Sequence, residues 1–230
     1  MPGASTRVRH RCSRVPTFHG TSALEAGVAD WSQQDIVTLL KTGVSARGSV
    51  LGPMAEVVLH STQHLSDADL GLYAVVDSAA WVARVVAAGV RTVQLRMKDA
   101  EGQPHRVRVR EEIRQSIRAA TAAGAQLFIN DHWQLAIEEG AYGVHLGQED
   151  LHVADLAAIR QAGLRLGVST HAYWEVCRAW ALQPSYIACG PIHPTQAKAM
   201  PWIPQGNDNL AYWCALLPLP IVAIAGMDCS

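Results

Sequence analysis

Short apolar runs alternate with longer amphipathic segments over the last two thirds of the chain. The apolar runs are rich in β-branched residues and are bounded by glycine or polar residues, which is typical of strands. The pattern predicts strands at residues 72–77, 92–98, 126–131, 143–147, 164–170, 186–190 and 221–226.

The segments between these runs predict helices. Residues 79–89 and 151–163 each carry an apolar stripe and end at glycine, as helix C-termini often do. Strands that are almost continuously apolar and alternate with helices indicate a parallel sheet with right-handed crossovers. We therefore expect an α/β fold, a (β/α) barrel of the TIM type. An open doubly wound sheet is the alternative, although the sequence has no GxGxxG or Walker-type loop to support it.

The pattern gives seven strands, whereas a closed barrel of this type has eight. Residues 71–230 are thus predicted to form an incomplete barrel that lacks its eighth strand–helix unit. Such a barrel would leave unpaired edges at 72–77 and 221–226. Residues 56–60 are the candidate strand that could cover them.

The first 70 residues differ in character from the barrel segment. Residues 1–29 are predicted to be a disordered leader, whose arginine-rich start resembles a transit peptide or an untranslated leader read in frame. Residues 30–70 are predicted to be a mainly helical or irregular appendage. Within it, a short helix at 31–43 is capped by Ser32 and ended by Gly43.

Composition narrows the class of partner. Lys and Arg total 19 against 20 Asp and Glu, so no bulk charge favours nucleic acid or an anionic membrane. An anionic small-molecule substrate would need a few well-placed cations. Five dispersed cysteines without a CxxC pair indicate reduced thiols and a cytoplasmic location, and no apolar run approaches the ~20 residues of a membrane span. A homo-oligomer is left open.

Polar residues gather where the predicted strands end. The stretch at 142–151 passes from an apolar strand directly into Gln148, Glu149 and Asp150. Because the C-terminal ends of parallel barrel strands lie on one face, such residues converge although they are distant in sequence. The residues expected on this face are Gln94, Arg96, Lys98, Asn130, Asp131, His145, Gln148, Asp150, Ser169, Thr170, His193, Thr195, Gln196 and Lys198.

These residue types indicate diphosphate chemistry. Asp131 and Asp150 suit Mg²⁺, which takes one or two protein carboxylates and fills its other positions with water and phosphate oxygens. Arg96, Lys98 and Lys198 could clamp a diphosphate, and its departure would need electrostatic stabilisation but no protein nucleophile. Three neutral side chains could orient a heterocycle: Gln94, Asn130 and Ser169.

Each residue also has a purely structural interpretation. Arg96 and Lys98 could form a solvated strand end, and Asp131 and Asp150 could be N-caps of the following helices. His145, within an apolar strand, is interpreted as an interior histidine rather than a base. The joint placement of these residues on one barrel face favours the functional interpretation.

Residues 71–226 resemble the thiamine-phosphate synthase family. The resemblance lies in GVRTVQLRMKD, LFINDHWQLAIEEGAYGVHLGQEDL, AAIRQAGLRLGVSTH and PSYIACGPIHPTQAKAMPWIPQG. It implies a (β/α) barrel and a Mg²⁺-dependent transferase. The reaction joins hydroxymethylpyrimidine diphosphate to thiazole phosphate after dissociative loss of diphosphate, giving thiamine phosphate. The alternative is a catalytically impaired fragment or fusion product that at most binds the pyrimidine diphosphate and Mg²⁺.

The resemblance also implies roles for individual residues. Asp131 and Asp150 would bind Mg²⁺, and catalysis would fall to Arg96, Lys98, Ser169 and Lys198. The substrate-binding set would be Gln94, Arg96, Lys98, Asn130, Ser169, Thr195, Gln196, Lys198 and Gly226. The chain departs from the family pattern at Ala197, at Ala225 and in the missing eighth strand.

Residues 30–70 resemble the C-terminal half of a c-type cytochrome domain, in which Met54 would be the axial haem ligand. The chain contains no CxxCH, so covalent attachment of haem is not expected.

Overall fold

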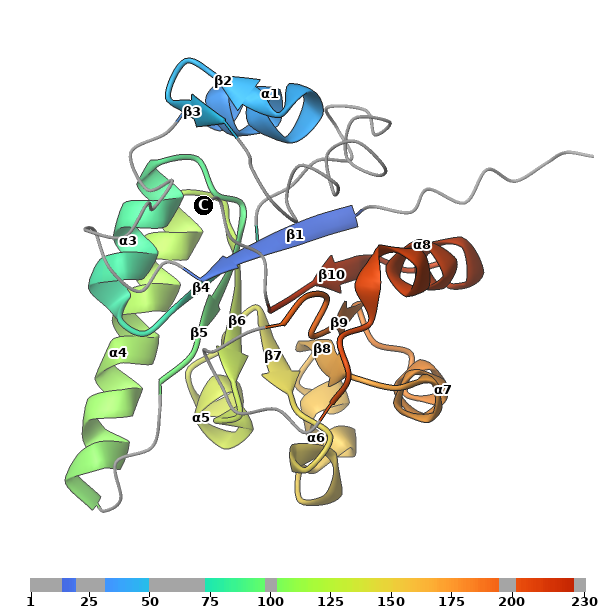
Figure 1. Ribbon diagram of the computed structural model, residues 1–230. Helices are drawn as coiled ribbons and strands as arrows, with labels where there is room; N and C mark the ends of the chain where they lie inside the picture. The colour runs from blue at the N-terminus through green and yellow to red at the C-terminus, as the bar shows by residue number, and fades with distance from the viewer. Residues whose placement is uncertain (1–13, 20–31, 50–72, 98–102, 195–201, 226–230) are drawn as a thin grey trace, which may run out of the picture.

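Eight parallel strands form a closed barrel surrounded by helices (Figure 1). The computed structural model describes residues 14–19, 32–49, 73–97, 103–194 and 202–225. The barrel strands are β1 (Arg14–His19), β4 (Tyr73–Val76), β5 (Thr92–Leu95), β6 (Gln126–Asn130), β7 (Gly143–Leu146), β8 (Arg165–Thr170), β9 (Tyr186–Cys189) and β10 (Ile221–Ala223). All seven strands predicted from the sequence are present, and the barrel fold is confirmed.

Helices connect successive strands and cover the outside of the barrel. They are α3 (Ala79–Ala87), α4 (Gln103–Ala122), α5 (Trp133–Glu138), α6 (Leu156–Gln161), α7 (Tyr173–Ala181) and α8 (Gly206–Leu216). The helix predicted at 151–163 is divided: a 3₁₀ turn at Asp150–His152 precedes α6, whose N-cap is Asp155. Within the described residues, no helix is both long and apolar enough to cross a membrane.

The predicted gap in the barrel is filled by β1. This strand pairs with β10 through Arg14, Val15 and Pro16, and with β4 through Thr17, Phe18 and His19. The prediction of a disordered leader is thus corrected for residues 14–19, which form the eighth strand. The candidate covering strand at 56–60 lies outside the described residues.

Residues 32–49, the other described part of the N-terminal region, form one helix and a hairpin. Helix α1 (Gln33–Thr42) has Ser32 as its N-cap and Gly43 as its C-cap, as predicted. Ser32 and Asp35 form a reciprocal capping box, which satisfies backbone N–H groups at the start of the helix. Strands β2 (Val44–Ser45) and β3 (Gly48–Ser49) pair as a small antiparallel hairpin.

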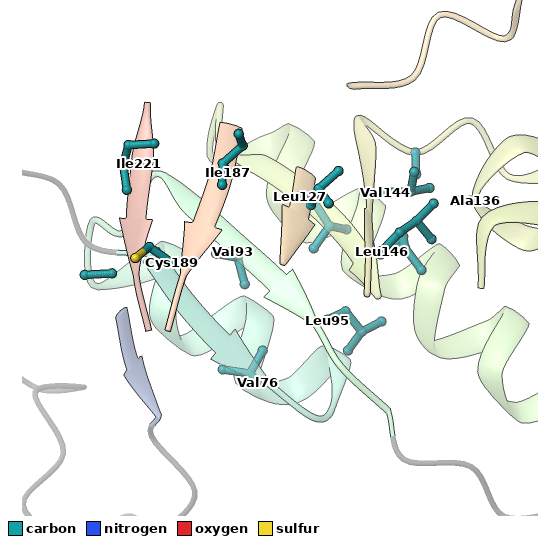
Figure 2. Packing of buried hydrophobic residues seen from close by; sticks show 14 of the residues in the cluster. Val76, Val93, Leu95, Leu127, Ala136, Val144, Leu146, Ile187, Cys189 and Ile221 are labelled. Atoms are coloured by element: carbon teal, nitrogen blue, oxygen red, sulfur yellow. The ribbon is translucent and has the colours of Figure 1, made fainter. Parts of the chain in front are cut away.

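From β4 to β10, side chains alternate along each barrel strand between the helices and the barrel interior. The outward-facing side chains and apolar residues of the helices form the main hydrophobic core. Figure 2 labels Ala136 of α5 and the strand residues Val76, Val93, Leu95, Leu127, Val144, Leu146, Ile187, Cys189 and Ile221. These side chains are almost fully buried against the surrounding helices. Burial of this apolar surface, at roughly 25 cal/mol per Å², is the main term that favours the fold.

The opposite positions form a second, smaller cluster inside the barrel. Its largest members are Tyr73, Phe128 and Tyr186, whose rings pack with centroids 5.0 to 6.4 Å apart. Gly167 leaves the room that the Tyr186 ring needs, since a Cβ at this position would lie 2.1 Å from a ring atom. Phe128 likewise stands opposite Gly143, so two of these three interior rings lie against a glycine on a neighbouring strand.

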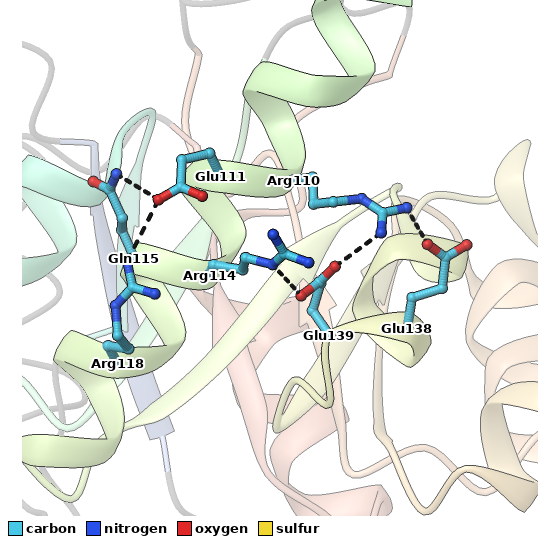
Figure 3. A network of polar contacts seen from close by, with 7 residues as sticks. All are labelled: Arg110, Glu111, Arg114, Gln115, Arg118, Glu138 and Glu139. Carbon is cyan, nitrogen blue, oxygen red and sulfur yellow. Dashed lines mark hydrogen bonds and ion pairs between the residues drawn. The ribbon is translucent and has the colours of Figure 1, made fainter.

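An ion-pair network ties α4 to α5 on the outer surface (Figure 3). Glu139, only 10% exposed, accepts from Arg110 at 3.2 Å and from Arg114 at 2.6 Å, while Glu138 pairs with Arg106 and Arg110. The exposed pairs contribute little individually. The shared, largely buried carboxylate of Glu139 fixes the position of α5 against α4.

Removing β1 tests whether it closes the barrel. Deletion of residues 1–19 would leave the backbone edges of β4 and β10 unpaired. We expect a loss of about 3 kcal/mol or more in the free energy of unfolding, or aggregation, because unmade ladder hydrogen bonds are exposed. Deletion of residues 1–13, which keeps β1, is the matched control. Equal thermal midpoints for both truncated chains and the full chain would show that β1 does not close the barrel.

Ala225 offers a second test, of local backbone conformation. It lies just beyond β10 with a φ of 62°, in the left-handed region that favours glycine. Its carbonyl accepts from the N–H of Ile192 at 3.2 Å, which holds it there. We expect Ala225→Gly to raise the free energy of unfolding by about 1 kcal/mol in chemical denaturation. Ala162→Gly, at a φ of −73°, is the control and should bring no gain.

Candidate active site

The C-terminal ends of the barrel strands bring six of the predicted site residues to one face. They are Gln94 and Arg96 from β5, Asn130 and Asp131 from β6, Asp150 from the turn after β7, and Ser169 from β8. Their strand neighbours Leu95, Ile129 and Val168 belong to the outer core, so Gln94, Asn130 and Ser169 face the interior. The other five residues that the sequence assigns a catalytic or substrate-binding role lie outside the described part of the chain: Lys98, Thr195, Gln196, Lys198 and Gly226.

Asp131 and Asp150 face each other across the ends of β6 and β7. The N–H of Asp131 donates to the carbonyl of His145 at 3.0 Å, which fixes the ends of the two strands together. Asp131 is held at a φ of 60°. Desolvation of its carboxyl group, the charge of Asp150 and a side-chain hydrogen bond with Asp150 raise the pKa of Asp131 from 3.8 to about 7.

The helix-capping interpretation of these two aspartates is not what the structure shows. The N-caps of α5 and α6 are His132 and Asp155. Asp150 instead accepts from the N–H of Gly147 at 2.9 Å, and this bond shapes the turn that follows β7. Its carboxylate thus has one oxygen engaged in the turn and is directed back toward Asp131.

Arg96 supplies positive charge beside this pair. Its backbone N–H donates to the carbonyl of Val76 at 2.7 Å, which continues the pairing of β5 with β4 beyond the last ladder residue. The guanidinium lowers the pKa of Asp131, although less than the other groups raise it, and also lowers the pKa of His145. Arg96 therefore lies within electrostatic range of both groups.

A chain of hydrogen bonds crosses the barrel interior beneath these residues. Gln94 Nε2 donates to the Tyr73 hydroxyl at 3.0 Å, which lies 2.5 Å from the Tyr186 hydroxyl. The Tyr186 hydroxyl is 2.6 Å from His145 Nδ1, and His145 Nε2 is 2.7 Å from Ser169 Oγ. The sequence analysis did not identify either tyrosine. Each tyrosine lies two residues before another interior residue of its strand, Val75 or Ala188, and this period of two was the signal that could have found them.

His145 is an interior histidine, as the sequence predicted. Burial and the nearby charge of Arg96 lower the pKa of its imidazole to about 3, so it is neutral. Burial likewise raises the pKa of Tyr73 and of Tyr186 above the usual range for tyrosine, and both keep their protons. The chain therefore consists of neutral groups.

The donor set at Asp131 and Asp150 fits a hard divalent cation. Two carboxylates that repel each other gain most from a cation between them, and oxygen donors suit Mg²⁺. Among the described residues, no three His, Cys, Asp or Glu side chains cluster as a metal site. Two protein carboxylates, with water and phosphate oxygens as the other ligands, are the arrangement that Mg²⁺ commonly takes.

Comparison with known proteins identifies the family. A family model described as thiamine monophosphate synthase matches residues 72–230. The thiamine-phosphate synthase of Klebsiella pneumoniae is 56% identical over 164 residues, which is 69% of this chain and 74% of that protein. The chain belongs to the thiamine monophosphate synthase family.

Other relatives agree with this assignment. The thiamine-phosphate synthase of Serratia proteamaculans is also 56% identical over 164 residues and covers the same shares of the two chains. The thiamine phosphate pyrophosphorylase structure from Pyrococcus furiosus has a TM-score of 0.59 at 24% identity, over 69% of this chain and 76% of that one. That likeness supports the fold. The cytochrome-like fragment predicted at 30–70 finds no support, since the family match begins at residue 72, and Met54 lies outside the described residues.

The carboxylate pair should make the stability of this family member depend on pH. The unfolded chain releases the Asp131 proton near pH 4, whereas the folded chain holds it until about pH 7. Without divalent cations, stability should therefore fall as pH rises between 4 and 7. Asp131→Asn, which tolerates the positive φ, should flatten this dependence. After allowance for solvent screening, we expect the thermal midpoint at pH 8 to rise by about 3–6 °C, from roughly 1–2 kcal/mol.

Thermal unfolding in EDTA across pH 4–8 checks this expectation. Asp77→Asn, an exposed residue just after β4 and two strands away from β6, is the control for loss of a carboxylate at the same rim. A midpoint that is unchanged or lowered by Asp131→Asn at pH 8 would show that the pair does not repel in the folded protein.

Proposed function

We propose that the chain is a transferase that joins a hydroxymethylpyrimidine diphosphate to a thiazole phosphate, with Mg²⁺, to give thiamine phosphate and diphosphate. The family assignment supports this reaction. The observation that carries it is the facing pair Asp131 and Asp150, beside Arg96 at the mouth of the barrel. Two acids and a guanidinium form a site for a metal-bound polyanion rather than for a neutral substrate.

In this proposal, the protein's main task is to make the diphosphate a good leaving group. The bond between the pyrimidine methylene carbon and the diphosphate oxygen breaks first, and the electron pair leaves with the diphosphate. Mg²⁺, when bound by Asp131 and Asp150, would partly neutralise the charge that develops on the departing oxygens. Arg96 adds a fixed positive charge, and Lys98 and Lys198 are proposed to do the same from outside the described residues.

The neutral side chains would orient the pyrimidine ring. Gln94 and Asn130 are 4% and 7% exposed, and Ser169 is held by His145, so their polar groups are fixed before substrate arrives. Fixed hydrogen-bonding groups lower the entropic cost of aligning the reacting carbon. The resulting carbocation, stabilised by the pyrimidine ring, is captured by the thiazole nitrogen.

The second substrate would lie beside the first on the same face. Thr195, Gln196 and Gly226 are proposed to hold the thiazole phosphate, although they lie outside the described residues. A cytoplasmic location and small-molecule partners form part of this proposal. The free thiols of Cys177 and Cys189 accord with that location.

The direct test is to incubate the purified chain with both substrates and Mg²⁺ and to measure thiamine phosphate by chromatography. We expect turnover that requires Mg²⁺ and that falls by roughly a hundredfold in Asp150→Asn, because one metal-binding carboxylate is lost. Asp155→Asn is the matched control: it removes an exposed carboxylate five positions further on and should retain activity, because asparagine can also cap helix α6.

The outcomes separate the two functional hypotheses. Calorimetric binding of the pyrimidine diphosphate with Mg²⁺ but without turnover would leave a binding fragment in place of an enzyme. Neither binding nor turnover at millimolar ligand would refute the proposed function.

A further inference from the structure

The buried hydrogen-bond chain inside the barrel connects two residues of the proposed pyrimidine site. It begins at Gln94 on β5 and ends at Ser169 on β8. Tyr73, Tyr186 and His145 lie between them and are only 2%, 5% and 5% exposed. None of these three has a part in the proposed reaction, yet each hydroxyl and each ring nitrogen has a partner within the chain.

The protons of this hydrogen-bond chain can be arranged in only two ways. Each of the three middle groups is neutral, because a charge buried without a counter-ion is costly and both imidazole nitrogens already face hydroxyl groups. Each middle group has one proton to donate, so the three groups together supply three of the four hydrogen bonds. The fourth proton must come from one end, so all links point from Gln94 to Ser169, or all point the other way.

The orientation of the Gln94 amide decides between these two orders. Its Nε2, which can only donate, is the atom that lies 3.0 Å from the Tyr73 hydroxyl. Tyr73 must then donate to Tyr186, and Tyr186 to His145 Nδ1. His145 carries its proton on Nε2 and donates it to Ser169 Oγ.

This order leaves the hydroxyl proton of Ser169 free for another acceptor. The backbone of Ser169 is also fixed, because Gln148 Nε2 donates to its carbonyl at 2.7 Å. Ser169 is half-buried near the C-terminal end of β8, on the same face of the barrel as Asp131 and Arg96. Its hydroxyl is thus held as a hydrogen-bond donor, and within the described residues its one hydrogen bond is the bond to His145.

We propose that Tyr73, Tyr186 and His145 are positioning residues that hold Ser169 as a hydrogen-bond donor to an acceptor atom of the pyrimidine substrate. The proposal rests on the proposed function for the identity of the ligand. The order of the chain itself depends only on the contacts inside the barrel. Reversal of the order would turn Ser169 into an acceptor and would favour a ligand that donates.

The tautomer of His145 tests the order without any substrate. Long-range ¹⁵N–¹H spectra of the labelled protein distinguish a protonated from an unprotonated ring nitrogen, and His145→Gln assigns the signal. We expect a proton on Nε2 and none on Nδ1. A proton on Nδ1 would overturn the proposal, whether or not the chain is an active synthase.

A double-mutant cycle tests the role toward substrate. Tyr186→Phe keeps the ring and removes the hydroxyl, so His145 Nδ1 loses its partner and Ser169 its imposed direction. We expect kcat/KM for the pyrimidine diphosphate to fall about tenfold in Tyr186→Phe. In the Ser169→Ala background the same change should have an effect of no more than about twofold, because the hydroxyl that it positions is absent.

The thermal midpoint distinguishes a positioning role of Tyr186 from general damage to the structure. The fall in thermal midpoint caused by Tyr186→Phe should be similar in both backgrounds, whereas its effect on kcat/KM should not. Tyr173→Phe, which removes an exposed hydrogen bond to Asn209 on the outer helices, is the matched control and should leave kcat/KM unchanged. Equal losses of kcat/KM in both backgrounds would overturn the positioning role. If the protein neither turned over nor bound the substrate, both the positioning role and the proposed function would be overturned.

Discussion

Closure of a parallel sheet into a barrel fixes the direction of every side chain on its strands. Alternate residues face either the helices or the interior, and all C-terminal strand ends meet on one face. The outward positions of this chain are almost uniformly aliphatic and form the main core. The inward positions carry aromatic rings, glycines and the polar groups of the candidate site.

The interior cluster illustrates how a polar site can be built inside a packed core. A buried hydroxyl or imidazole is tolerated only when its hydrogen-bonding capacity is met. Tyr73, Tyr186 and His145 meet this requirement through one another, and the chain ends at residues on the open face. The same contacts that make burial tolerable therefore also orient Gln94 and Ser169.

The carboxylate pair, unlike the hydrogen-bonded interior groups, destabilises the fold. Desolvation of the Asp131 carboxyl group and its repulsion by Asp150 together raise the pKa of Asp131 to about 7. Asp131 also occupies a backbone conformation that few residues other than glycine adopt readily. Arg96 offsets only part of this cost. Such unfavourable features persist where surrounding structure enforces them, and they commonly mark functional sites.

Much of the fold could be read from the sequence because it depends on local periodicity. The seven strands, the capped helix at 33–42 and the gathering of Gln94, Asn130, Asp131, Asp150 and Ser169 at one face all follow from patterns within short stretches. The resemblance to the family followed from the same stretches, and residues 72–230 match the family model. The single predicted helix at 151–163 was divided because Asp155 starts a new turn as an N-cap.

Only the tertiary structure decided how the barrel closes and which interior side chains are hydrogen-bonded to one another. Residues 14–19 are short, contain a proline and lack any strand-like alternation, so nothing local predicts their pairing with β4 and β10. The facing of Asp131 and Asp150 and the links between Tyr73, Tyr186 and His145 join residues far apart along the chain. The sequence alone determined which residues stand at strand ends, because side-chain alternation is a local property. Distances between strands arise only when the sheet closes, and those distances set the charges, protons and hydrogen bonds of the site.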